Sequence, residues 1–501
     1  MMRKLAAVSL TALALAACNS SEDTPAVAMA GAEDCAAIDV SVLGVEGAST
    51  NWVEATEELP AFCEVSATLS PAEGSTIGVV YRLPEAWNGK LLGLGGGGWA
   101  GNITLQSASD GLSKGYATMQ TDGGNAGTDV WNNSWVAERP ESATDFSHRA
   151  IHEMTVAGKA LANAHYGQAH QRAYFQGCST GGRMALMEAQ RYPTDYDAII
   201  AGAPVYTLQV QTSAVFRNQT FAANGGAGGF TPEDLQLVQT SVLALCDAAD
   251  GLADGIVNDP ASCSWEPASL QCEGAKDASC LSSGQVTAMQ AAYDGRRASD
   301  GSWMMHPMRR GGEAGWAFFV GTDGTGNDPT GGGGLANLFP LFFGENNRVK
   351  LGNFNDANYL GVRGSDFAEM YEAKNADLSE FFANGGRLML WHGESDPGPS
   401  PVGSNEYAEA VMSGNPAAAS QFRYFTLPGV GHCAGGPGAD MVDYVAAMDD
   451  WVESGTAPER LIGSKLDGSI TRPHCAWPNV ARFEGEGDAN DPDSWSCVPR
   501  T

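Results

Sequence analysis

The sequence predicts an α/β fold, with a largely parallel β-sheet covered by helices. Three observations support this prediction. Short apolar segments alternate with segments of helical spacing over residues 35–204, and the alternation resumes over 386–501. Between them, residues 205–385 contain glycine clusters, four cysteines and scattered aromatic residues instead. A serine bracketed by glycines stands between one of the strands and the helix that follows it.

The core elements follow from apolar runs and from helical spacing. Apolar residues at helical intervals predict a helix over 151–165. Short, mostly apolar runs predict strands at 76–83, 90–94, 173–175, 198–204, 386–391 and 422–427. We therefore expect one core built from two chain segments, with residues 205–385 inserted between them as a lid.

The segment Gly177-Cys-Ser-Thr-Gly181 connects the strand at 173–175 to a stretch of helical spacing. Gly-x-Ser-x-Gly in this context indicates a nucleophile elbow, the turn that exposes the reactive serine of an α/β-hydrolase. Bulky residues two positions before or after the serine would prevent so tight a turn. We predict that Ser179 is the nucleophile and that the N–H of Thr180 points at the developing oxyanion.

A second oxyanion donor is expected from the glycine run that directly follows the strand at 90–94. In α/β-hydrolases the loop after the third strand supplies this N–H. Glycine lets the backbone approach the substrate without a Cβ in the way. We assign the donor to Gly98 or to its neighbour Gly97.

A serine nucleophile needs a base and an acid that orients the base. In this architecture the order along the chain is serine, acid, histidine. Asp396 lies in the turn after the strand at 386–391, and His432 lies in a glycine-bracketed loop after the strand at 422–427. His392 is the rival base, but it precedes the acid, so we expect it to hydrogen-bond within its own turn.

Two cysteines flank this proposed triad. Cys178 immediately precedes Ser179, and Cys433 immediately follows His432. A disulfide between them would join the nucleophile and base loops at the site of the chemistry. The alternative is a pair of unrelated buried thiols, but two cysteines adjacent to the triad favour the disulfide.

These segments together resemble a known family. Gly-Cys-Ser-Thr-Gly-Gly-Arg at 177–183, His-Gly-x-x-Asp at 392–396, Gly-His-Cys at 431–433 and the late cysteines Cys475 and Cys497 are similar to motifs of the tannase and feruloyl esterase family of α/β-hydrolases. That family includes bacterial hydrolases of mono(2-hydroxyethyl) terephthalate. The resemblance extends from about Cys35 to Cys497. It implies an α/β-hydrolase core with a large lid and hydrolysis of esters of aromatic acids.

The resemblance, together with the positions of the cysteines, also implies a disulfide framework. Eleven cysteines, less the leader cysteine Cys18, leave an even number, as expected of an exported protein. The implied pairs are Cys35–Cys63, Cys178–Cys433, Cys246–Cys263, Cys272–Cys280 and Cys475–Cys497.

An acidic loop in the insertion predicts a structural calcium ion. Asp247, Asp250 and Asp254 fall within eight residues and would repel one another without a cation, and hard oxygen ligands suit Ca²⁺. The resemblance implies that the backbone carbonyls of Leu252 and Ile256 complete the ligands. The spacing is not that of an EF-hand, and a solvated acidic turn is the alternative.

Aromatic residues and arginines in the insertion are candidates for binding the substrate. Trp303 and Trp316 could hold a flat acyl ring, and Arg309 or Arg310 could bind a distal carboxylate. The alternative is that most of these residues form the core of the lid itself.

The N-terminus predicts export. Arg3 and Lys4 precede an apolar run over 5–17, and Leu15-Ala-Ala-Cys18 has the form of a bacterial lipoprotein cleavage site. We expect a signal peptide at 1–17, lipid anchoring through Cys18, a tether at 18–34, and an outer-membrane or periplasmic address. The alternative is an ordinary secretory signal cleaved elsewhere, for example after Ala30.

The formal net charge of −31 argues against nucleic acid as a partner. The function predicted from all these features is a serine esterase for small aromatic esters of the feruloyl, galloyl or terephthaloyl type. The alternatives are a serine peptidase or amidase with the same triad, and a binding lipoprotein without catalysis.

Overall fold

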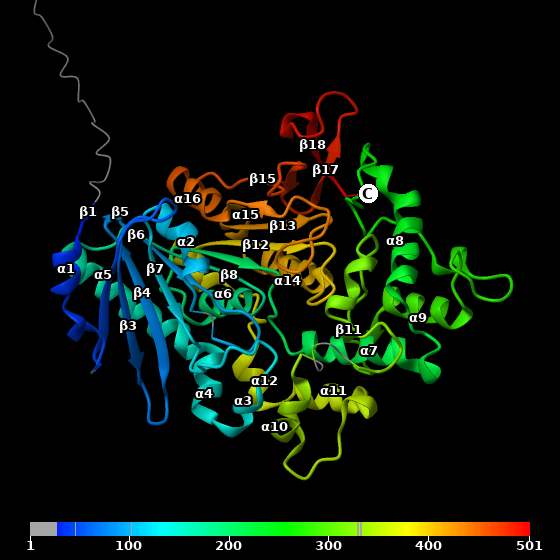
Figure 1. The fold of residues 1–501 in the computed structure, drawn as a ribbon, viewed down its shortest axis with the longest axis horizontal. Helices are drawn as coiled ribbons and strands as arrows, with labels where there is room; N and C mark the ends of the chain where they lie inside the picture. Colours follow the sequence, from blue (N-terminus) through cyan, green and yellow to red (C-terminus); the bar gives the residue numbers. More distant parts are fainter. Residues whose placement is uncertain (1–27, 46, 102, 328–329, 331–332, 501) are drawn as a thin grey trace, which may run out of the picture.

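The computed structural model describes residues 28–500 except 46, 102, 328–329 and 331–332 (Figure 1). The expected signal peptide, Cys18 and most of the tether lie outside the described residues. Within the described part of the chain, no helix has the length and apolar character needed to span a membrane.

A nine-stranded sheet forms the centre of the molecule, in the order β13-β12-β9-β8-β6-β7-β4-β3-β2. Neighbours from β13 to β7 are parallel, and β4, β3 and β2 add an antiparallel edge. The strands are β2 Ser49–Val53, β3 Phe62–Leu69, β4 Ile77–Pro84, β6 Lys90–Leu94, β7 Ala117–Thr121, β8 Arg172–Cys178, β9 Ala198–Gly202, β12 Arg387–Gly393 and β13 Phe422–Leu427. The predicted α/β class is confirmed, and the parallel strands end at one edge, where their loops meet.

Helices cover both faces of the sheet because successive side chains of a strand point to opposite sides. In β12, Leu388 and Leu390 face one hydrophobic layer, while Met389 and Trp391 face the other. The first layer contains α5 Ala150–Tyr166, α6 Thr180–Arg191 and α14 Pro401–Gly414. The second contains α2 Leu105–Ser113 and α16 Tyr444–Ser454.

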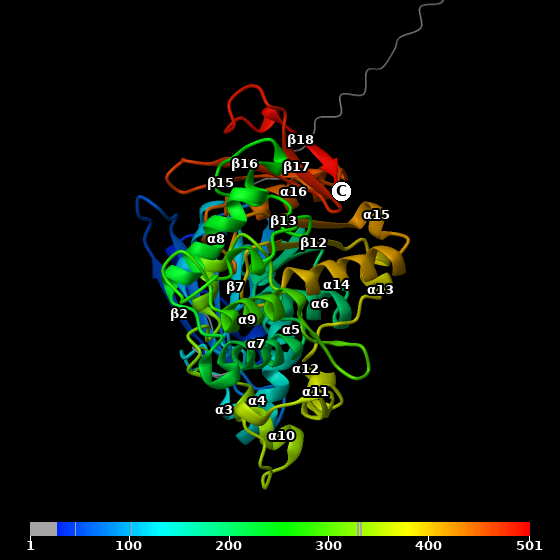
Figure 2. The same ribbon diagram turned by 90° about the vertical axis from the view of Figure 1, so that its right-hand side faces the viewer.

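The segment 205–385 packs in two different ways. Its first part, with α8 Pro232–Cys246, α9 Ser283–Asp294 and the 3₁₀ helix η5 Glu313–Phe318, has a hydrophobic core of its own. Apolar residues of its second part join the first layer of the main core; this part comprises α10 Phe339–Phe343, α11 Asp356–Arg363, α12 Asp366–Tyr371 and α13 Ser379–Ala383. Helix α7 Gln209–Gly226 contributes to both cores. Figures 1 and 2 show α7, α8 and α9 grouped beside the sheet.

Smaller elements and disulfides complete the fold. The remaining α-helices and strands are β1 Ala28–Met29, α1 Ala32–Ala36, β5 Ala86–Trp87, α3 Ser134–Glu138, α4 Pro140–Thr144, β10 Arg296–Arg297, β11 Trp303–Met305, α15 Ala418–Gln421, β14 Met441–Val442, β15 Arg460–Ser464, β16 Thr471–Cys475, β17 Asn479–Phe483 and β18 Trp495–Pro499. The five disulfides are Cys35–Cys63, Cys178–Cys433, Cys246–Cys263, Cys272–Cys280 and Cys475–Cys497. These are the pairs that the family resemblance implies.

Truncating Trp316 should destabilise the separate core of α8, α9 and η5. Trp316 is 1% exposed and packs edge to face on Tyr293, so Trp316→Ala should lower the free energy of unfolding by about 3–5 kcal/mol. Phe318→Ala is the matched control, because Phe318 is 73% exposed and its loss should cost no more than about 0.5 kcal/mol. Denaturant unfolding of both variants measures the difference, and equal stabilities would contradict this packing.

Candidate active site

Ser179 lies in the turn between β8 and α6 with a backbone conformation that favours glycine. Its φ is 62°, a strained value that persists only where the surrounding structure holds it. The turn is tight enough that a Cβ on Gly177 would lie 2.5 Å from backbone atoms of Gly181. Ser179 N–H donates to the carbonyl of Gly202 at the end of β9, at 3.0 Å. Strand and helix therefore hold the serine at the carboxyl edge of the sheet.

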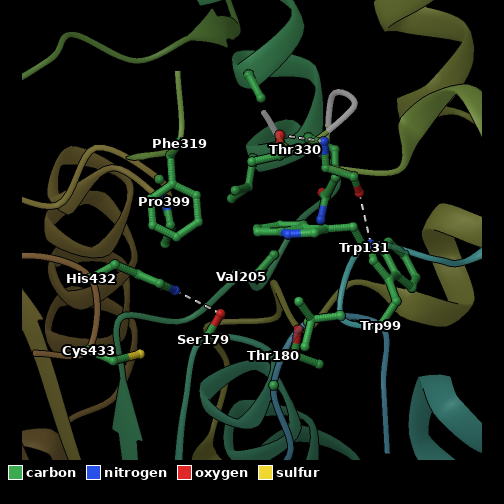
Figure 3. A pocket seen from close by; sticks show the side chains of 18 of the residues that line it. Trp99, Trp131, Ser179, Thr180, Val205, Phe319, Thr330, Pro399, His432 and Cys433 are labelled. Carbon is green, nitrogen blue, oxygen red and sulfur yellow. Dashed lines mark hydrogen bonds between the residues drawn. The ribbon is translucent and has the colours of Figure 1, made fainter. Parts of the chain in front are cut away.

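Two loops at the same edge place a histidine and an aspartate in line with this serine. Ser179 Oγ is 2.9 Å from His432 Nε2 (Figure 3), and His432 Nδ1 is 2.6 Å from Asp396 Oδ2. Asp396 follows β12 and His432 follows β13, which are parallel neighbours in the sheet. The structure thus brings together the three residues selected from the sequence.

The carboxylate of Asp396 is buried, and its ionisation depends on its partners. Burial alone raises the pKa of Asp396, but His432 and His392 outweigh this effect and lower it to about 2. The N–H of Gly398 also donates to Asp396 Oδ1 at 2.8 Å. Asp396 is therefore an ionised acceptor at neutral pH, suited to orienting the His432 ring.

His392, the rival base, binds the acid instead of the nucleophile. Its Nε2 is 3.2 Å from both Asp396 Oδ2 and the carbonyl oxygen of Pro399, and its Nδ1 is 2.7 Å from Ser404 Oγ. Both ring nitrogens are thus engaged within the turn that carries the acid and the helix that follows it. This geometry agrees with the expectation that His392 hydrogen-bonds locally.

Backbone N–H groups from two segments line the cavity around Ser179. Thr180 begins α6, where N–H groups have no acceptor within the helix. In the glycine run, Gly95 N–H donates to Gln176 O at 2.9 Å, and Gly96 N–H points at Met184 Sδ at 3.5 Å. Gly97 and Gly98 remain as the candidates for the second donor, as predicted from the sequence.

The cavity over Ser179 has a volume of about 420 Å³. Its wall includes the aromatic and aliphatic side chains of Trp131, Phe319, Val205 and Val210. Figure 3 shows Trp131 across the cavity from Phe319, with Ser179 and His432 below them. Phe319 packs edge to face on the ring of His432, with centroids 5.0 Å apart. The site is therefore a largely apolar pocket with Ser179 and His432 at one end.

The substrate residues predicted from the sequence were wrong, because none of the four lines this cavity. Trp316 belongs to the core of η5 and its neighbours, and Trp303 Nε1 donates to Glu406 at 2.9 Å. Arg309 Nε lies 3.4 Å from the buried carboxylate of Glu394, and Arg310 donates to the carbonyl of Trp265. Residues 303–319 are rich in aromatic side chains, but the sequence does not reveal which of these side chains point into the cavity. Of that stretch, Phe319 is the residue that lines the cavity.

Trp131 and Arg217 line the cavity but were missed, because no periodicity or motif marks them. Arg217 is buried in α7, and its Nη1 donates to the carbonyls of Pro397 and Gly398 at 2.5 and 2.6 Å. These carbonyls belong to the turn that carries Asp396. Arg217 therefore connects the inserted segment to the acid loop.

The acidic loop lies beside the C-terminal strands, outside the cavity over Ser179. The carboxylate of Asp247 accepts the N–H groups of Asp254, Gly255 and Ile256 at 3.0–3.3 Å. Asp254 Oδ2 pairs with Arg472 at 2.6 Å, while its Oδ1 is buried without a hydrogen-bond partner. Burial, with Asp254 and Asp247 nearby, raises the pKa of Asp250 to about 6. Among the described residues, no three acidic, histidine or cysteine side chains converge as metal ligands.

Comparison with known proteins gives a consistent result over most of the chain. A family model described as tannase and feruloyl esterase matches residues 63–313 and 346–498. The chain is 31% identical to mono(2-hydroxyethyl) terephthalate hydrolase of Piscinibacter sakaiensis, with 88% of this chain and 85% of that protein covered. It is 29% identical to feruloyl esterase B of Aspergillus niger, with 87% and 86% covered. The crystal structure of feruloyl esterase B from Aspergillus oryzae superposes with a TM-score of 0.80 at 26% identity, covering 93% of this chain and 99% of that one.

The disulfide between the two loops should support turnover as well as stability. Cys178 and Cys433 are adjacent to Ser179 and His432, and their Cα atoms are 5.9 Å apart. We expect Cys178→Ala/Cys433→Ala to lower kcat at least tenfold in protein that is still folded, because the two loops lose their shared alignment.

The matched control is Cys272→Ala/Cys280→Ala, which removes a disulfide with a sequence separation of 8 instead of 255. In the chain-entropy account the shorter loop contributes about 2.5 kcal/mol and the longer about 5.5 kcal/mol. Steady-state kinetics and thermal unfolding of both double variants test this prediction. An unchanged kcat in the first variant would contradict it.

Proposed function

The chain belongs to the tannase and feruloyl esterase family, and we propose that it cleaves esters of aromatic acids through Ser179, His432 and Asp396. Esterase activity follows from the family itself. The residues that carry it and the class of acid are our proposal. One arrangement supports both the residues and the class of acid. Hydrogen bonds connect Ser179 to His432 and His432 to Asp396, and Ser179 and His432 line an apolar pocket with aromatic side chains in its wall.

In the proposed reaction His432 first accepts a proton and later returns it. His432 Nε2 takes the proton of Ser179 as Oγ attacks the ester carbonyl, and Asp396 stabilises the imidazolium that forms. The N–H groups of Thr180 and of Gly97 or Gly98 would bind the oxyanion, and loss of one such donor typically costs about 3–4 kcal/mol of transition-state stabilisation. The imidazolium then protonates the departing alcohol. Water hydrolyses the acyl-enzyme by the same sequence, with His432 again as the base.

The walls of the pocket favour an aromatic acyl group. Trp131 and Phe319 present ring faces and edges to the cavity, and a planar ring buried between them would gain apolar contact area. Arg217 lines the cavity, and its Nη1 donates to two backbone carbonyls of the acid loop. Its guanidinium keeps a positive charge beside the cavity, so a terephthalate monoester would not enter purely apolar surroundings. We therefore propose feruloyl-, galloyl- and terephthaloyl-type esters together as the substrate class.

A panel of methyl esters that differ only in the acid tests this proposal. Methyl ferulate, methyl gallate and monomethyl terephthalate should each show kcat/KM at least tenfold above methyl hexanoate, because burial of the aromatic ring is favourable. Ser179→Ala should remove activity on all four esters while leaving thermal unfolding unchanged. Equal activity on aliphatic and aromatic esters would overturn the substrate class, and substantial turnover by Ser179→Ala would overturn the triad.

An anilide of ferulic acid should be a poor substrate if the enzyme is an esterase and not an amidase.

We also propose that the acidic loop binds a structural calcium ion. The buried Oδ1 of Asp254, which has no hydrogen-bond partner, and the raised pKa of Asp250 support this proposal, because a cation would neutralise both carboxylates. Asp250, Asp254 and Ile256 also line one small cavity. The side chains of Asp247, Asp250 and Asp254 and the carbonyls of Leu252 and Ile256 would hold the ion. It would order the loop between Cys246 and Cys263 and supply no group to the reaction.

Chelation should then lower thermal stability more than it lowers turnover. Removing a ligand that binds the folded state costs about 2.7 kcal/mol when that ligand was present at 100 times its Kd. Tm should fall on treatment with a chelator and recover with Ca²⁺, and Asp250→Asn should abolish this response. Asp294→Asn is the matched control, because Asp294 is an exposed aspartate at the end of α9. A Tm that responds to neither chelator nor Ca²⁺ would contradict the proposal.

A further inference from the structure

A second histidine, His392, contacts the acid of the proposed triad from within the protein core. It is the penultimate residue of β12 and is completely buried. Alternate side chains of a strand point to the same face, so His392 points to the layer that contains Leu388, Leu390 and α14. It is not among the described residues that line the cavity over Ser179. Any influence of His392 on the reaction therefore has to pass through Asp396.

The ring of His392 is held at both of its nitrogens. Nε2 lies 3.2 Å from Asp396 Oδ2 and 3.2 Å from the carbonyl oxygen of Pro399. Both of these atoms are acceptors, so Nε2 carries a hydrogen. Nδ1 is 2.7 Å from the hydroxyl of Ser404 in α14, which can donate to an unprotonated nitrogen or accept from a protonated one. The ring therefore presents the same N–H to the acid in either charge state.

One carboxylate oxygen of Asp396 is shared between two histidines. Oδ2 is 2.6 Å from His432 Nδ1 and 3.2 Å from His392 Nε2, while Oδ1 accepts the N–H of Gly398 at 2.8 Å. Three donors on two oxygens hold the carboxylate in one orientation. A hydrogen bond to a carboxylate also stabilises its charged form. The bond from His392 therefore weakens the attraction of Oδ2 for the imidazolium that forms at His432.

The contacts of serine, histidine and aspartate thus occur twice around a single aspartate. One set, Ser179 and His432, opens into the cavity. The other, Ser404 and His392, is closed off in the core, with 1% and 0% of the side chains exposed. Building on the proposed function above, we propose that His392 and Ser404 are positioning residues for the reaction, which fix the carboxylate of Asp396 toward His432 and moderate its charge.

Other charged groups near this turn are fixed independently of the proposed pair. They are Arg217, Arg309, Glu394, Arg500, His306 and Glu406. Each has a hydrogen-bond or ion-pair partner other than His392 and Ser404. Substituting the proposed pair therefore changes the hydrogen bonds and the charge at Asp396 while these other bonds are retained.

Substitutions at His392 separate a positioning role from a merely structural one. In His392→Phe, which loses the donor to Asp396, kcat should fall at least about tenfold with little change in KM, because the substrate site is untouched while the base loses its alignment. The acid limb of the pH profile of kcat/KM should move up by about 0.5 pH unit or more, because the carboxylate would hold the imidazolium more strongly and the base must be neutral to act. His392→Gln keeps an N–H donor near the position of Nε2 and should restore most of the rate and the wild-type profile.

His306→Phe is the matched control, because His306 is a buried histidine, 6% exposed, that pairs with Glu406 and not with Asp396. This variant should lose thermal stability but keep the wild-type kcat and pH profile. Ser404→Ala removes the hydroxyl bound to Nδ1 and should lower kcat about threefold, since the ring is then less firmly held. It decides the question if His392→Phe does not fold.

All variants are assayed with 4-nitrophenyl acetate, whose hydrolysis depends on the triad and not on the class of acid. If the wild-type protein does not hydrolyse it, or if Ser179→Ala retains the activity, the proposed function fails and this inference fails with it. If the wild-type activity depends on Ser179 but the folded variants of His392 and Ser404 keep the wild-type kcat and pH profile, the inference alone is overturned.

Discussion

The buried charge of Asp396 is the constraint on which the geometry of the site depends. A carboxylate out of contact with water is unfavourable unless hydrogen bonds and opposite charge surround it. Here His432, His392 and the N–H of Gly398 supply those partners, and the pKa of the carboxyl group is lowered to about 2. The requirement to satisfy this charge sets the position of His432. The position of His432 in turn sets its distance to Ser179.

The acid loop is held by side chains that come from distant parts of the chain. Arg217 of α7 binds the carbonyls that follow Asp396. Two residues before Asp396, the buried Glu394 lies between Arg309 of the inserted segment and Arg500 near the C-terminus, at 3.4 and 3.0 Å. Burial raises the pKa of Glu394, but these two arginines lower it below its usual value. The inserted segment therefore does more than cover the site, because it supplies cations that hold the loop of the acid.

The inserted segment 205–385 is not a uniform lid, because its two parts pack differently. The part around α8, α9 and η5 has its own apolar core, whereas α10 to α13 pack into the main core. Phe319 from the first part lines the cavity over Ser179. A segment with an independent core can vary in its lining side chains with little effect on the sheet. We therefore expect substrate selectivity to be determined mainly there.

The sequence by itself determined the features that local chemistry specifies. Glycine spacing around Ser179 and the order of serine, acid and histidine predicted the elbow and the loops that carry the partners, and apolar runs predicted the core strands. Tertiary structure decided which side chains meet across the sheet edge. The stretch 303–319 is rich in aromatic residues, yet Trp316 is buried in a core and Phe319 faces the cavity. Trp131 and Arg217 had no sequence signal, because a pocket wall is assembled from segments far apart in the chain, and no local periodicity records which of their side chains point into the common space.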